Sequence, residues 1–131
     1  MNEPHPFDAL ENYNYLSLTT YRRSGEAVPT PVWFARSGDA LYVFTDVESG
    51  KVKRIRNDPR VTLASCDMRG RVRGESIEAA ARVLDEHKFG VADETLVQKY
   101  GWQYRASRAY LRFRGKDVRS AFLEISSRNT D

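Results

Sequence analysis

Cysteine and histidine are scarce in this sequence. Among its 131 residues there is one cysteine, Cys66, and there are two histidines, His5 and His87. A single cysteine excludes an internal disulfide and is typical of a protein from a reducing cytoplasm, so we expect a cytoplasmic protein. The histidines lie far apart without a cysteine cluster, so we expect no metal site. Neither has an evident nucleophile beside it, so any catalysis would depend on a bound cofactor.

Long apolar runs are also missing. No stretch approaches the roughly 20 residues of a membrane-spanning helix, so we expect no membrane partner. The first residues carry Glu3, Asp8 and Glu11 and lack a basic start, so we expect no secretory signal. With 40% hydrophobic and 30% charged residues in 15.0 kDa, the composition predicts one folded domain. We place this domain at residues 7–126, with tails at 1–6 and 127–131.

Basic residues are concentrated in two segments of a chain whose net charge is only +3. Residues 49–60 contain five basic residues and one acidic residue, and residues 101–120 contain six and one. This distribution indicates a localised anionic partner, which would be nucleic acid, a phosphorylated small molecule or an acidic surface. The alternative is that both segments are simply solvated faces.

The pattern of apolar residues predicts a mainly β fold with short helices. We expect six strands, at residues 15–21, 28–35, 40–45, 60–66, 76–84 and 119–126. Helices are expected at residues 7–12, 49–57 and 86–100, with Gly101 as the stop of the last one. Short antiparallel strands interrupted by helices favour a small β-barrel.

The start of the helix at residues 49–57 is a candidate anion site. A helix N-terminus has unpaired N–H groups and the positive end of the helix dipole, which suit a phosphate. Ser49 adds a hydroxyl, Gly50 permits close approach, and Lys51, Lys53 and Arg54 add positive charge. The pattern is neither a P-loop nor a dinucleotide fingerprint. The alternative is a plain capped surface helix.

The segment from Val28 to Phe34 is a candidate platform for a flat ring. Pro29 and Pro31 remove ladder donors, so this strand must be irregular or lie at a sheet edge. A planar ring could lie against it, with the free N–H groups of Val32 and Trp33 pointing toward the ring. The alternative is an edge strand whose prolines only block unwanted pairing.

Taken together, these segments resemble a known family. The blocks Pro29-Thr30-Pro31-Val32-Trp33-Phe34 and Ser49-Gly50-Lys51-Val52-Lys53-Arg54, with Leu41 to Thr45 between them, closely resemble the pyridoxamine 5′-phosphate oxidase-like split-barrel family. More narrowly, they resemble its actinobacterial branch, which uses the deazaflavin coenzyme F-420 in place of FMN. The resemblance covers residues 7–126. It implies a six-stranded antiparallel split β-barrel that forms a homodimer with two cofactor sites at the interface.

The resemblance also implies the residues of the site. In that family the second block grips the cofactor phosphate, which corresponds here to Lys51, Lys53 and Arg54 with Ser49 and Gly50. The ring lies against the first block, and the residues that would hold it are Thr30, Pro31, Val32 and Trp33, with Thr45 lining the same groove. No residue is assigned to catalysis. Trp33, Tyr100 and Trp102 are further candidates for aromatic walls of the pocket.

The implied activity is hydride transfer to a conjugated, planar acceptor such as a quinone, an enone or a biliverdin-like tetrapyrrole. The second basic segment would meet the acidic tail of the deazaflavin. Ala80 and the run from Ser76 to Glu78 depart from the family pattern, so no substrate is carried over. Three alternatives remain open: an FMN-dependent enzyme of the pyridoxamine 5′-phosphate oxidase type, a non-catalytic cofactor-binding protein, and a basic nucleic-acid-binding barrel.

Overall fold

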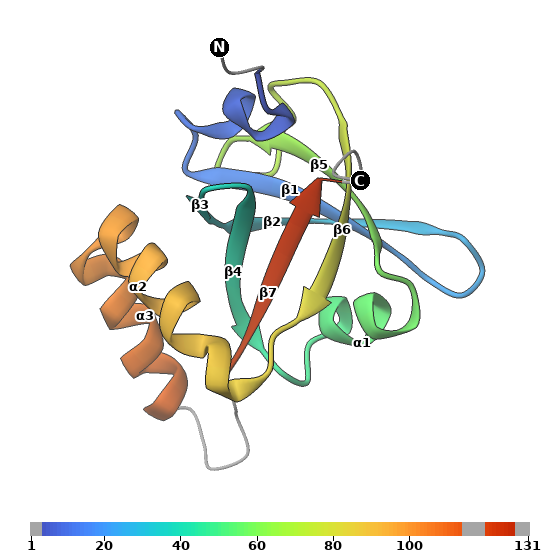
Figure 1. The fold of residues 1–131 in the computed structure, drawn as a ribbon. Helices are drawn as coiled ribbons and strands as arrows, with labels where there is room; N and C mark the ends of the chain where they lie inside the picture. Colours follow the sequence, from blue (N-terminus) through green and yellow to red (C-terminus); the bar gives the residue numbers. More distant parts are fainter. Residues whose placement is uncertain (1–3, 114–119, 128–131) are drawn as a thin grey trace.

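Seven antiparallel strands form one curled sheet in the computed structural model, which describes residues 4–113 and 120–127 (Figure 1). The strands run in the order β2-β1-β5-β6-β7-β4-β3 across the sheet. Their bounds are β1 (Tyr15–Tyr21), β2 (Ala27–Trp33), β3 (Ala35–Ser37), β4 (Ala40–Asp46), β5 (Arg60–Cys66), β6 (Ile77–Val83) and β7 (Ser120–Ser127). The predicted class, a mainly β split barrel with short helices, is confirmed, with seven strands in place of six.

The additional strand arises because the segment expected as one strand at residues 28–35 divides at Phe34. The Phe34 N–H donates to the Tyr100 hydroxyl at 3.0 Å, and the same hydroxyl donates toward the Phe34 carbonyl oxygen at 2.7 Å. The backbone N–H and carbonyl of Phe34 are therefore hydrogen-bonded to a side chain, and Phe34 does not take part in strand pairing. Since β2 and β3 lie at opposite edges of the sheet, their one-residue connection requires the sheet to curl until β2 contacts β4.

Strand β2 lies at an edge, as its prolines predict. Pro29 and Pro31 stand opposite Thr19 and Ser17 of β1, and both prolines are exposed. Their missing N–H groups cost no ladder bond on the open side of the strand.

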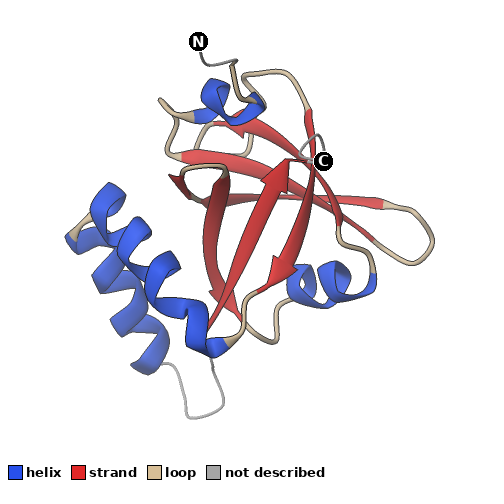
Figure 2. Ribbon diagram, in the orientation of Figure 1, coloured by secondary structure: helices blue, strands red, loops and turns tan. Residues whose placement is uncertain are grey.

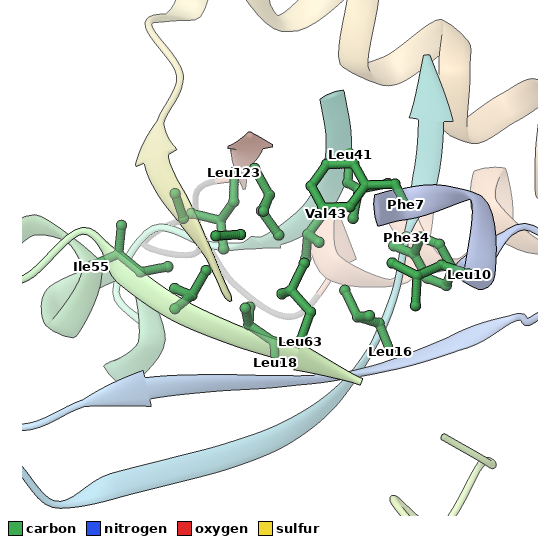
Figure 3. Packing of buried hydrophobic residues seen from close by; sticks show 14 of the residues in the cluster. Phe7, Leu10, Leu16, Leu18, Phe34, Leu41, Val43, Ile55, Leu63 and Leu123 are labelled. Carbon is green, nitrogen blue, oxygen red and sulfur yellow. The ribbon is translucent and has the colours of Figure 1, made fainter. Parts of the chain in front are cut away.

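The core fills the inside of the curl (Figure 3). Successive residues of a strand point to opposite faces, so Leu41 and Val43 of β4 point inward together with Leu123 of β7. The short 3-10 helix η1 (Pro6–Leu10) adds Phe7 and Leu10 at one end. At the other end, α1 (Gly50–Asn57) buries Val52 and Ile55, which lie three residues apart on one helix face.

A helical hairpin covers the outer side of β4 (blue in Figure 2). It consists of α2 (Phe89–Tyr100), preceded by the short η2 (Glu86–Lys88), and α3 (Trp102–Phe113). The helix expected at 86–100 is confirmed, and Gly101 ends it with a φ of 62°. The sequence reasoning did not anticipate α3. A second apolar cluster joins the hairpin to the sheet and comprises Ala35, Tyr42, Leu84, Ala92, Leu96, Tyr104 and Phe122.

The described elements run from η1 to β7. Helix η1 begins at Pro6, and β7 reaches Ser127, whose side chain is buried. His5 belongs to the folded part, because its Nδ1 accepts a hydrogen bond from the Phe7 N–H at 3.1 Å. Among the described helices, none has the length and apolar character needed to cross a membrane.

Candidate functional site

The two candidate motifs meet in one cavity of about 380 Å³, which we call the β2–α1 cavity. Strand β2 contributes Pro31, Val32 and Trp33, and α1 contributes Lys51. The remaining lining residues are Tyr15, Phe44, Leu96, Tyr104 and Ser107. The volume falls within the range of roughly 300–1,000 Å³ that is typical of small-molecule sites, and the mixture of aromatic walls with one cation suits a flat anionic ligand.

The ring of Trp33 stacks on the ring of Tyr100. The two rings stack with centroids 4.5 Å apart and planes inclined by 9°. The Tyr100 hydroxyl accepts from the Phe34 N–H, and its one hydrogen is shared between two acceptors, the Phe34 carbonyl oxygen at 2.7 Å and the Asn14 carbonyl oxygen at 2.8 Å. Burial raises the pKa of Tyr100 far above its ordinary value, so the hydroxyl remains a donor. The aromatic wall of the cavity is therefore fixed in place before any ligand binds.

Lys51 places a poorly compensated positive charge in the cavity. Burial of its ammonium lowers the pKa, the charge of Arg54 lowers it further, and Asp46 partly opposes both effects. Within residues 4–113 and 120–127, no carboxylate lies at ion-pair distance from Lys51. A half-buried ammonium without a counter-ion is stabilised by an anion.

Arg54 brings a second cation to the same end of α1. Its Nε donates to Thr20 Oγ1 at 2.6 Å, and its Nη1 lies 2.7 Å from the position that a Cβ on Gly50 would occupy. The guanidinium therefore folds back over the first turn, where the helix dipole is positive. Burial lowers the pKa of Arg54, and the charge of Arg22 adds to this effect. Two cations and a helix N-terminus in contact are a favourable setting for a phosphate.

Lys53 faces a separate hollow. A groove of about 280 Å³ is lined by Tyr21, Arg22, Arg23, Lys53, Arg54 and Asn57. The structure thus brings Lys53 and Arg54 together in this groove and leaves Lys51 in the β2–α1 cavity. On a helix, two residues at positions i and i+2 project about 200° apart, which explains the divergence of Lys51 and Lys53. Arg54 lines this groove and interacts electrostatically with Lys51 and with Arg22.

Four predicted residues line neither hollow: Thr30, Thr45, Ser49 and Gly50. Thr45 is buried, and its Oγ1 lies 3.3 Å from Ser49 Oγ. Ser49 occupies the N-cap position of α1, but its side chain makes no capping hydrogen bond. Thr30 stands opposite Leu18 in the β1–β2 ladder, between the two prolines.

Several lining residues escaped the sequence reasoning because they come from elements distant in the sequence. Tyr104 and Ser107 belong to α3, which was not predicted. The Tyr104 hydroxyl donates to Asp93 Oδ1 at 2.6 Å, and the Arg108 guanidinium donates to the same oxygen at 2.6 Å. Of the proposed aromatic walls, Trp33 lines the cavity and Tyr100 supports it, whereas Trp102 is 75% exposed and lies outside.

The most voluminous of these hollows, about 690 Å³, contains none of the predicted site residues. It is lined in part by Phe34, Arg36 and Lys99, and burial lowers the pKa of Lys99 to about 8. Among the described residues, no group of histidine, cysteine and carboxylate side chains is arranged to hold a metal. Cys66 is buried, and burial raises the pKa of its thiol, which disfavours the reactive thiolate.

Comparison with known proteins gives the family. The pyridoxamine 5′-phosphate oxidase family matches residues 5–123, so the chain belongs to this family. No curated protein matches the sequence.

Solved structures share the fold at low sequence identity. A conserved hypothetical protein from Mycobacterium tuberculosis superposes with a TM-score of 0.69 at 20% identity, over 98% of this chain and 82% of that one. The heme storage protein HutZ from Vibrio cholerae gives 0.68 at 9% identity, over 96% and 92%. An FAD-binding protein from Mesorhizobium loti gives 0.60 at 15% identity, over 93% and 84%. At these identities the likeness extends to the fold alone.

Proposed function

We propose that the protein binds a phosphate-bearing flavin-type cofactor in the β2–α1 cavity and acts as an oxidoreductase. Our preferred cofactor is the deazaflavin coenzyme F-420, and FMN is the alternative. One observation carries the proposal: Lys51 lines the same cavity as Pro31, Val32 and Trp33. A cation for a phosphate and a stiff strand for a flat ring therefore lie within reach of a single small molecule.

The residues present fit such a group. The Trp33 indole and the Phe44 and Tyr104 rings offer apolar surface to a tricyclic ring. Lys51, Arg54 and the first turn of α1 offer positive charge that nothing in the described chain fully neutralises. The bound cofactor would supply the hydride, and the role of the protein is to bind, orient and exclude water.

Coenzyme F-420 is preferred because it carries a phosphodiester and an acidic tail. Arg54 lines a groove together with Arg22, Arg23 and Lys53, so positive charge continues from the first turn of α1 into a region that would meet this tail. FMN lacks that tail. The acceptor we propose is a conjugated, planar molecule such as a quinone, an enone or a biliverdin-like tetrapyrrole.

A non-catalytic role is the second candidate. A protein described as a heme storage protein has the same fold, so the fold also occurs in a protein whose described role is to bind a molecule. A carrier of this kind would bind the cofactor without turnover on any acceptor.

The test is equilibrium binding of coenzyme F-420 and FMN, measured side by side by fluorescence, with Lys51→Ala and a matched control. Charge-assisted hydrogen bonds contribute about 1.5–3 kcal/mol, so Lys51→Ala should weaken binding of the true cofactor by more than tenfold. Arg56→Ala is the control, because Arg56 lies on α1, is exposed and lines neither hollow. Unchanged affinity in Lys51→Ala, or an equal loss in Arg56→Ala, would overturn the proposed site.

A further inference from the structure

Helix α3 presents three large aromatic side chains to solvent. Trp102 is 75% exposed, Tyr110 66% and Phe113 88%. Exposed aromatic residues gathered on one short element mark an interaction surface more often than isolated apolar residues do.

The spacing of these residues defines a continuous outer face. Trp102, Ala106, Ala109 and Phe113 follow one another at intervals of four, three and four residues, which keeps them on one side of a helix. Tyr104 lies on the opposite side, buried edge-on against Phe44 with ring centroids 5.6 Å apart. The helix therefore has two apolar faces, of which the fold covers one.

The charge of α3 indicates an anionic partner. The helix contains Arg105, Arg108 and Arg112 in its sequence and no acidic residue. Arg108 is paired with Asp93 at 2.6 Å, whereas Arg105 has no carboxylate partner in the described part of the chain. Basic residues flanking an aromatic face are typical of helices that lie in the interface of an anionic bilayer.

Two other occupants fit this face less well. Packing of two α3 helices against each other would bring arginines toward arginines, because the helix has no acidic residue to pair with them. A single-stranded nucleic acid needs aromatic rings alternating with basic groups along a groove. Tyr100 and Tyr104, which flank Trp102 in the sequence, are not free for base stacking, because Tyr100 stacks on Trp33 and Tyr104 is buried against Phe44.

We propose that the outer face of α3, formed by Trp102, Ala106, Ala109, Tyr110 and Phe113 and flanked by Arg105, docks onto the surface of an anionic phospholipid bilayer. The helix lies in the interface without crossing it. This proposal replaces the expectation from composition that no membrane is involved. Because Tyr104 and Ser107 of the same helix line the β2–α1 cavity, docking brings that cavity within about one helix diameter, roughly 10–12 Å, of the lipid.

The test is co-sedimentation of the full chain, without added cofactor, with vesicles of phosphatidylcholine alone and of phosphatidylcholine containing phosphatidylglycerol. We expect binding to the anionic vesicles that weakens as salt is raised. Trp102→Ala/Phe113→Ala should lower the partition coefficient by more than tenfold, because both rings are lost from the interface. Arg105→Ala should lower it about fivefold on anionic vesicles and leave binding to phosphatidylcholine unchanged.

Met68→Ala/Val91→Ala is the matched control, because these apolar side chains are exposed but lie outside α3. It should bind vesicles as the wild type does. Urea unfolding of all variants checks that they remain folded. The proposal is overturned if the wild type does not sediment with anionic vesicles, or if the double variant and the control bind equally. It is also overturned if Trp102→Ala/Phe113→Ala converts a dimer to a monomer, since a second copy would then cover this face. Vesicle binding is measured without cofactor. A failure to bind any cofactor would therefore contradict the proposed function and leave the proposal of lipid binding standing.

Discussion

At the scale of single residues, the Tyr100 hydroxyl is the contact on which most of the site depends. It accepts a hydrogen bond from the Phe34 N–H, and its one hydrogen is shared between the carbonyl oxygens of Phe34 and Asn14. The ring of the same residue stacks on Trp33. One side chain at the end of α2 thus fixes both the junction between β2 and β3 and the aromatic wall of the cavity.

We predict that Tyr100→Phe destabilises the protein by about 1–3 kcal/mol, because the stack remains but a buried peptide loses its partner. Urea unfolding measures this free energy. Tyr110→Phe is the control, because Tyr110 is exposed and should change stability by less than about 0.5 kcal/mol. Equal stability of wild type and Tyr100→Phe would show that water replaces the hydroxyl at no cost.

We predict that Lys99 makes the free energy of unfolding depend on pH. Its Nζ donates to the Tyr13 carbonyl oxygen at 2.8 Å and lies 3.6 Å from the Phe34 ring centroid, and burial lowers its pKa to about 8. An unfolded lysine keeps its proton up to a pH near its ordinary pKa of about 10.4. Between these values the unfolded chain binds more protons than the folded one, so stability attributable to Lys99 rises with pH.

The measurement compares the free energy of unfolding of the wild type and Lys99→Met across this range. The wild type should gain stability relative to the variant as the pH rises from about 8 toward 10.4, with a constant difference below pH 8. Parallel curves over the whole range would contradict the lowered pKa.

At the scale of elements, most strands could be predicted because alternating burial leaves a period of two in the sequence. The division of the second strand could not, because its cause is the hydroxyl of a residue 66 positions away from Phe34. Helix α3 was not predicted, because its segment of the sequence was interpreted only as a concentration of basic residues. Its inner face depends on Tyr104, whose burial requires the β4 surface to be in place.

The candidate site was also predicted only where its residues are close together in the sequence. The two motifs on β2 and α1 identified Pro31, Val32, Trp33 and Lys51 from sequence alone. The divergence of Lys51 from Lys53 was available from helix geometry, since alternate helical residues project to nearly opposite sides. The positions of Tyr15 and Phe44 in the lining were not, because they depend on how the sheet curls.

The α2–α3 connection carries a prediction about glycine. Gly101 has a φ of 62°, a conformation that L side chains rarely adopt, whereas Gly90 lies in α2 with no atom within 4 Å of a Cβ built on it. Gly101→Ala should therefore destabilise the protein by about 1–3 kcal/mol. Gly90→Ala should stabilise it by up to about 1 kcal/mol through helix propensity. Thermal unfolding distinguishes the two signs, and two shifts in the same direction would contradict this account.

At the scale of the whole molecule, we expect the functional unit to be a homodimer, as the family resemblance implies. If a partner subunit completes the site, dilution should dissociate the dimer and weaken cofactor binding over the same range of concentration. Analytical ultracentrifugation and a parallel binding titration measure both quantities. A monomer with undiminished affinity would place the complete site within one chain.

The one-residue link between β2 and β3 has a consequence for hydrogen exchange. Phe34 belongs to no strand, yet its amide hydrogen is bound to a hydroxyl at the end of a helix. A deuterium label should therefore enter that amide about as slowly as the neighbouring ladder amides, and only when the hairpin of helices separates from the sheet. In the mass spectrum of the peptide that spans this position, a linker residue would then report the separation of the helical hairpin from the sheet.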